Sequence, residues 1–181
     1  AGPGNANTDT IPNEDSRDFN LEATNLFQLN RFPGRDRVSS GQRVDYGLNY
    51  AIHGGSDRRL TSFIGQSYRL NGGDEIPEIA GGDGGLSDIV GRVELRPLPD
   101  VDALYRFRID EENFEARRHE LGLAAGPRKL RVNLDYTFLD DTGTRSGFAR
   151  AREELFGQIA SRFARHWSAF ASHRRDVAAG D

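Results

Sequence analysis

Residue types that can perform catalysis occur in this chain, but their spacing does not bring them together. The four histidines are His53, His119, His166 and His173. No glycine–X–serine–X–glycine sequence, the motif that exposes a nucleophilic serine on a sharp turn, is present. The adjacent acids at 111–112, 140–141 and 153–154 could suggest the two carboxylates of a glycosidase. We expect all three pairs at strand ends on one side, which is more typical of a solvated rim. The sequence therefore predicts no catalytic residue, and we expect a protein that is not an enzyme.

Metal and cofactor chemistry has equally little support. The chain has no cysteine, which removes disulfides, thiolate metal sites and cysteine nucleophiles together. Residues 81–88 are rich in glycine and aspartate and are faintly similar to a calcium-binding glycine repeat. The second aspartate is wrongly spaced, however, and the motif occurs once, whereas such sites are built from stacked repeats. We predict neither a metal nor a cofactor.

Charged residues set among apolar ones are the most informative chemical feature. Of the 24 basic residues only Lys129 is a lysine, and the net charge is −4, which argues against a nucleic-acid partner. Arginines alternate with acids, so pairs between neighbouring strands could stiffen a wall. A second interpretation stays open, in which some arginines bind phosphate groups or a partner protein. The candidate residues of this polar face are Asp45, Asn49, Arg92, Glu94, Asp102, Arg106, Arg108, Arg131, Asp135 and Arg162.

The elements that must position these side chains are β-strands, because apolar and polar residues alternate along most of the chain. Leu130, Val132, Leu134, Tyr136 and Phe138, for example, alternate with polar residues. A period of two is the signature of a sheet with one apolar face. We expect eight strands, near residues 43–53, 59–70, 87–97, 101–110, 114–125, 128–139, 151–164 and 167–176.

The connections between these strands are alternately short and long. This pattern predicts an all-β fold, an antiparallel up-and-down meander that forms an arc of a larger transmembrane β-barrel. Strands of about 9–11 residues suffice to cross a membrane when they are tilted. In a barrel the charged face would line the lumen, and aromatic residues near the strand ends would form an interfacial girdle. A soluble β-sandwich alternates in the same way and stays open as the alternative, as does a generic porin-like wall.

The blocks Asn25–Phe27 and Arg31–Arg37, with several others, resemble the organic-solvent-tolerance family, the lipopolysaccharide-assembly protein LptD, in its alphaproteobacterial form. The resemblance begins at Ile11–Ser16, continues through Gly41–Gly47 and Phe63–Arg69, and extends to Arg152–Leu155. Its most specific part is a loop motif formed by Asn25, Leu26, Phe27, Arg31, Phe32, Pro33, Gly34, Asp36 and Arg37. The resemblance covers nearly the whole chain and points to the C-terminal β-barrel of that family.

The resemblance implies an integral protein of the bacterial outer membrane that inserts lipopolysaccharide into the outer leaflet. Its expected partners are lipopolysaccharide, outer-membrane lipids, the plug lipoprotein LptE and the proteins of the periplasmic transport bridge. We expect the chain to depart from the family in extent, without the N-terminal jellyroll and the first and last barrel strands. We therefore expect a fragment of the barrel, and we expect the bridge proteins to act through parts that are not in this chain.

Two segments follow from this interpretation, an extracellular loop at 1–42 and a partial barrel at 43–181. Residues 31–37 of the loop could fold inward over the lumen as a constriction. Alternatively the loop packs on its own strands through Phe27, Phe32 and the turn at Pro33 and Gly34.

Overall fold

The computed structural model describes residues 21–28, 42–71, 85–127, 129–140, 152–163 and 166–177. It contains eight strands, and each lies within two residues of its expected bounds. The strands are β1 (Gln42–His53), β2 (Arg59–Asn71), β3 (Ile89–Leu98), β4 (Val101–Ile109), β5 (Ala116–Ala125), β6 (Leu130–Leu139), β7 (Arg152–Arg162) and β8 (Ser168–Asp176).

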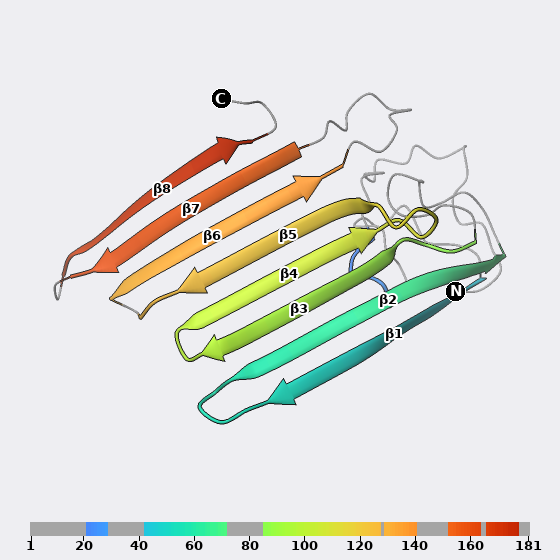
Figure 1. Ribbon diagram of the computed structural model, residues 1–181, viewed down its shortest axis with the longest axis horizontal. Coiled ribbons are helices and arrows are strands. Elements are labelled where there is room, and N and C mark those ends of the chain that lie inside the picture. The colour runs from blue at the N-terminus through green and yellow to red at the C-terminus, as the bar shows by residue number, and fades with distance from the viewer. Residues whose placement is uncertain are drawn as a thin grey trace, which may run out of the picture. The chain divides into compact units, whose positions relative to one another are not determined.

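The strands form one antiparallel sheet in which every strand pairs with its neighbours in sequence, in the order β1 to β8 (Figure 1). The predicted all-β meander is thereby confirmed, and the arrangement is consistent with an arc of a β-barrel. Sequential pairing arises because short turns return the chain beside the strand it has just left. In the part of the chain that the structure describes, no helix is long and apolar enough to cross a membrane.

Two of the short turns use backbone conformations that favour particular residues. In the turn from Gly54 to Arg58, both Ser56 and Asp57 have φ near 61°, and the Gly54 amide donates to the Arg58 carbonyl at 2.8 Å. Two successive positive φ values match the right-handed twist of a hairpin. Gly126, with φ of 101°, begins the turn between β5 and β6, where its amide donates to the Asp100 carbonyl at 2.9 Å.

The chain divides into two compact units. Unit 1 comprises Ala1–Leu48, Ile64–Gly91 and Arg108–Glu115, and unit 2 comprises Asn49–Phe63, Arg92–Phe107 and Ala116–Asp181. Among the described residues of unit 1, the buried hydrophobic side chains are Leu21, Leu26 and Val90. The same unit contains buried polar and charged residues, namely Ser67, Ser87, Asp88, Arg108 and Asp110. Its interior is therefore as polar as it is hydrophobic.

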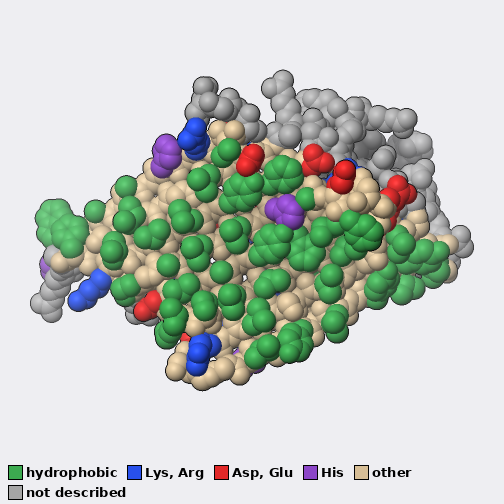
Figure 2. All heavy atoms as spheres, in the orientation of Figure 1, with side chains coloured by type: hydrophobic (Ala, Val, Ile, Leu, Met, Phe, Trp, Pro, Cys, Tyr) green, Lys and Arg blue, Asp and Glu red, His purple; other side chains and the backbone are tan. Residues whose placement is uncertain are grey.

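In unit 2 the strand register separates an apolar face from a polar one. Tyr136 lies opposite Leu121 on β5 and Leu155 on β7, whereas Asp135 lies opposite Gly122. Hydrophobic side chains cover the face of β5–β8 that is turned to the viewer in Figure 2. Several of them are exposed, notably Leu121, Leu130, Leu134, Leu155 and Ile159. An exposed apolar face of this kind marks a surface for contact with lipid or with another part of a protein.

Candidate functional site: the charged strand face

A buried ion pair joins β4 to the start of β3 in unit 1. The Arg108 Nε atom lies 3.3 Å from Oδ2 of Asp88, and the two side chains are only 7% and 6% exposed. Removing two charges from water is costly unless each neutralises the other. Arg108 was predicted on the polar face, and the structure places it in the interior of unit 1. Its principal role there is to compensate a buried carboxylate.

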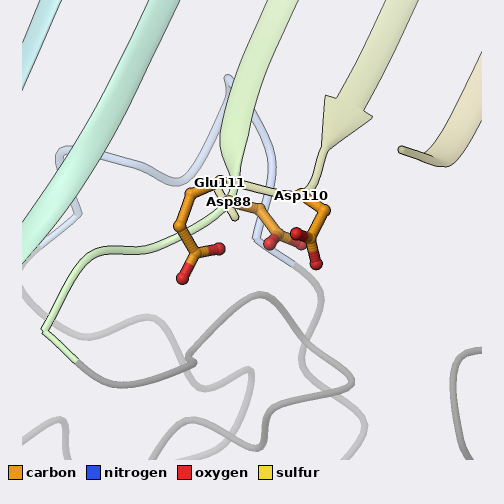
Figure 3. A group of neighbouring side chains, drawn as sticks. All are labelled: Asp88, Asp110 and Glu111. Carbon is orange, nitrogen blue, oxygen red and sulfur yellow. The ribbon is translucent and has the colours of Figure 1, made fainter. Parts of the chain in front are cut away.

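Three carboxylates gather at the strand ends beside this pair (Figure 3). Oxygen atoms of Asp88, Asp110 and Glu111 all lie within 4.8 Å of one another. The Oδ1 atom of Asp110 accepts the amides of Glu112 and Asn113, each at 2.9 Å, and so closes the turn after β4. Oxygen ligands of this kind suit Ca²⁺, so these are the described residues that could hold a metal. Arg108 already supplies a positive charge to Asp88, and the geometry alone assigns no ion to the cluster.

The described part of the 1–42 segment, Leu21–Gln28, is attached to the polar face of β1. A guanidinium nitrogen of Arg43 donates to the Gln28 carbonyl, and Arg43 Nε lies 3.1 Å from Asp45 Oδ2. Asp45 in turn accepts the Ser67 hydroxyl at 2.6 Å. The predicted polar-face residue Asp45 therefore anchors an arginine that holds the loop.

The first three residues of the loop motif have different environments. Asn25 Oδ1 accepts the Glu22 amide at 2.8 Å and closes a tight turn, while Leu26 is fully buried and Phe27 is 55% exposed. The remaining motif residues lie outside the described part of the chain, namely Arg31, Phe32, Pro33, Gly34, Asp36 and Arg37. The inward position of residues 31–37 therefore stays a prediction.

A ladder of ion pairs crosses the polar face of unit 2. Asp102 on β4 accepts Arg96 Nε of β3 at 2.6 Å and Arg131 Nη2 of β6 at 3.3 Å. Arg96 also pairs with Asp57 in the turn after β1, at 2.9 Å. Because these side chains are partly exposed, each pair contributes little to stability by itself. Together they link three strands and the preceding turn.

Two further groups of ion pairs extend the ladder. On β4 and β5, Arg106 Nη1 lies 3.0 Å from Glu120 Oε2, and Arg118 contacts the other oxygen of the same carboxylate. On β7, Glu154 pairs with Arg152 and with Arg174 of β8, the latter at 2.8 Å. Each glutamate is thus shared by two arginines.

A groove lies between the charged groups of this face. It has a volume of about 330 Å³ and is lined by Arg59, Glu94, Asp102, Leu104, Gly122 and Asp135. A Cβ atom added to Gly122 would lie 3.3 Å from Asp135 Oδ1, so the missing side chain helps to keep the groove open. Apolar and charged residues line the groove together, which suits a ligand or a partner segment that has both characters.

The other predicted polar-face residues have simpler surroundings. Arg92 and Glu94, both on β3, pair at 3.3 Å with side chains that are 37% and 38% exposed. Asn49 is exposed on β1. Arg162 lines a second hollow, together with Arg131 and Phe170.

Sequence reasoning missed several residues of the polar face. Phe156 and Phe170 lie on it, since they pair in register with Arg174 and Ala160. The Arg174 guanidinium lies 5.6 Å from the centre of the Phe156 ring, within range of a cation–π contact. The sequence alone did not assign Arg174 and Phe170 to a face, because polar and apolar residues alternate weakly in β8. Phe170 lies between two alanines, and Arg174 is next to a second arginine. Only the strand register shows that Phe156 and Arg174 are neighbours.

A histidine with a close side-chain partner lies on the other face of the sheet. His119 is on the apolar face of β5, where its Nδ1 atom is 2.5 Å from the Tyr105 hydroxyl and its ring stacks on the Tyr105 ring. An imidazole held in this way has no neighbouring serine or carboxylate among its hydrogen-bond partners.

The charged face offers ion pairing, hydrogen bonding and apolar contact, which are the means of binding.

Comparison with known proteins identifies a family. The model of the family LptD, LPS transport system D, matches residues 1–167 of the chain. Among curated proteins, no match was found.

Proposed function

Because the chain belongs to the LPS transport system D family, we propose that it forms part of the wall of an outer-membrane translocon. The wall would insert lipopolysaccharide into the outer leaflet. Membership of the family already implies involvement in lipopolysaccharide transport, and the family is one of outer-membrane proteins. The observation that supports the translocon role best is the two-sided sheet, with exposed apolar residues on one face and an ion-pair ladder on the other.

The physical argument starts from what each face requires. Exposed residues such as Leu134 and Ile159 favour contact with lipid, whereas Arg96, Asp102 and Arg131 favour contact with water. A strand whose side chains alternate in this way can separate a lipid phase from an aqueous lumen. The strands, of 9 to 13 residues, are long enough to cross the apolar layer.

The ladder suggests how such a wall would work on its cargo. Pairs among arginines and acids keep the wall rigid and its field nearly neutral, so an anionic lipid is not held irreversibly. The groove beside Gly122 offers apolar contact next to charge, which matches either the amphipathic cargo or the plug lipoprotein LptE. In this mechanism the chain binds, orients and releases, and no covalent bond is made or broken.

The transport role is tested by depleting the full-length protein from cells. We expect newly made lipopolysaccharide to stop reaching antibodies outside the cell and to accumulate beneath the outer membrane. A plasmid copy should restore surface delivery. Normal surface delivery after complete depletion would contradict the proposal, and a wall with porin-like permeability only would then be the better interpretation.

The orientation of the faces is tested by two neighbouring photo-crosslinking positions on β6. Asn133 lies on the polar face and Leu134 on the apolar face, as their partners Ala124 and Leu123 do. We expect a photoreactive residue at 133 to capture LptE or lipopolysaccharide in cells, and one at 134 to capture mainly phospholipid. Equal capture of LptE from both positions would show that the polar face does not line a lumen.

The absence of enzymatic activity is also part of the proposal. Purified full-length protein, incubated with lipopolysaccharide in detergent, should leave the mass of the lipid unchanged in mass spectrometry. Loss of an acyl chain, a phosphate or a sugar that depends on the protein would overturn this part and leave the transport role standing.

A further inference from the structure

An arginine and a histidine lie on the apolar face of β8, at the edge of a hydrophobic surface. In the register, Arg175 is opposite Leu155 and His173 is opposite Gly157, so both share the face of Leu134, Tyr136 and Leu155. Both side chains are exposed. Figure 2 shows histidine and basic side chains at the edge of the hydrophobic field over these strands. A charge in such a position needs a specific reason.

An arginine is unusual on the apolar face of β8 but ordinary on its polar face, as the adjacent Arg174 shows. Arg174 points to the polar face, where its Nε atom lies 2.8 Å from Glu154 Oε1. Arg175 makes no ion pair with any of the residues that the structure describes. The acid on its own face, Glu153, accepts a hydrogen bond from the Tyr136 hydroxyl at 2.9 Å. Within the described part of the chain, the Arg175 guanidinium is therefore open to a ligand.

The position of Arg175 along the strand indicates a depth at the membrane interface. Trp167, 68% exposed, directly precedes β8. Arg175 follows it by eight residues, which corresponds to about 26 Å along a strand. The apolar band of a membrane-spanning sheet is about 25 Å tall, and arginine is tolerated on the lipid face near its edges but not at its centre. Trp167 and Arg175 therefore fit the two opposite interfaces.

We propose that Arg175, assisted by His173, binds the phosphate group of a lipid in the leaflet beside this end of the wall. The inference rests on the membrane placement in the proposed function. A guanidinium forms two parallel hydrogen bonds with a phosphate, and it is the preferred side chain for this task. Gly157, opposite His173, has no side chain, and the Leu134 side chain of β6 lies over this point, 3.5 Å from where a Cβ atom would be. The site lies on the outer face of the wall and is distinct from the groove beside Gly122.

The proposal can be tested on the full-length protein in a nonionic maltoside detergent that contains no phosphate. The probes are dioleoyl phosphatidic acid and dioleoylglycerol, which differ only in the phosphate, and native mass spectrometry counts the bound lipid. We expect phosphatidic acid to be retained and dioleoylglycerol not. Arg175→Ala, or the double variant His173→Ala/Arg175→Ala, should weaken retention by about tenfold, since a charge-assisted interaction is lost. Arg175→Lys should restore part of it.

Arg174→Ala is the matched control, because it removes the same charge from the opposite face of the same strand. We expect it to retain phosphatidic acid within about twofold of the wild type, as the loss of an exposed ion pair has a small effect. Equal losses in Arg174→Ala and Arg175→Ala would overturn the site, as would unchanged binding in Arg175→Ala. Displacement by millimolar inorganic phosphate would also overturn it, because the ligand would then be a free anion and not a lipid.

The outcomes separate this inference from the proposed function. If only the lipid site is wrong, the protein still needs detergent and still delivers lipopolysaccharide, while Arg175→Ala binds phosphatidic acid as the wild type does. If the membrane placement is wrong, the wild-type protein is monomeric and cooperative without detergent and retains neither lipid.

Discussion

Replacing Arg108 by alanine is expected to lower the free energy of unfolding by about 3–5 kcal/mol, the usual cost of breaking a buried ion pair from one side. Arg108 lies 3.3 Å from the Asp88 carboxylate, and both side chains are more than nine-tenths buried. The substitution removes a positive charge from a site where Asp110 and Glu111 also bring negative charge. Urea unfolding of the full-length protein in detergent micelles, followed by tryptophan fluorescence, measures the loss.

The control for this prediction is Arg92→Ala. Arg92 pairs with Glu94 at the same distance of 3.3 Å, but with side chains that are 37% and 38% exposed. An exposed pair contributes about 0–1 kcal/mol, so this variant should unfold almost as the wild type does. Similar losses in both variants would mean that burial does not govern the energy of the Arg108–Asp88 pair. Adding Asp88→Asn to Arg108→Ala should recover part of the lost stability, because the buried carboxylate charge is then also removed.

Gly126→Ala is expected to destabilise the hairpin between β5 and β6 by about 1–3 kcal/mol, the range for a residue forced into an unfavourable backbone conformation. Gly126 has φ of 101°, and an added Cβ would lie 2.3 Å from the Leu130 carbonyl oxygen. That contact cannot be relieved by a side-chain rotation, because the obstructing atom belongs to the backbone. The turn must therefore open, which weakens the pairing of Ala125 with Val132.

Gly55→Ala is the matched substitution in another turn. No atom lies within 4 Å of a Cβ built on Gly55, so alanine should be tolerated with an effect near zero. Hydrogen exchange of the full-length protein in detergent measures the local effect. Faster exchange at the amides of β5 and β6 is expected in Gly126→Ala and not in Gly55→Ala. Unchanged exchange in both variants would show that the turn adapts without cost.

The alternation of residue types determined much of the fold. The run from Leu130 to Phe138 can bury one face only as a strand, and the short turns leave adjacent antiparallel pairing as the simplest connection. The same alternation assigned Arg106, Arg131 and Asp135 to one face of their strands. A period of two is a local property, so it can be read without knowing which strands pair.

Contacts between strands could not be predicted in this way, because they depend on register. Asp102 on β4 pairs with Arg131 on β6, although β5 lies between them, and no sequence spacing predicts this contact. The phase of β8 was equally ambiguous, and pairing with β7 decided that Phe170 joins the polar face and Arg175 the apolar one. A shift of register by one residue would exchange these faces.

The sequence by itself thus determined the strands, their two-sided character and, through its resemblance to a known family, the expected cargo. The tertiary structure decided which of the described charges neutralise each other and how deeply each pair is buried. Burial distinguishes the Arg108–Asp88 pair from the exposed Arg92–Glu94 pair, although the residue types are similar. The physical reason is that the energy of an ion pair depends on how well water screens it. That screening is set by residues that pack around the pair and lie far apart in the chain.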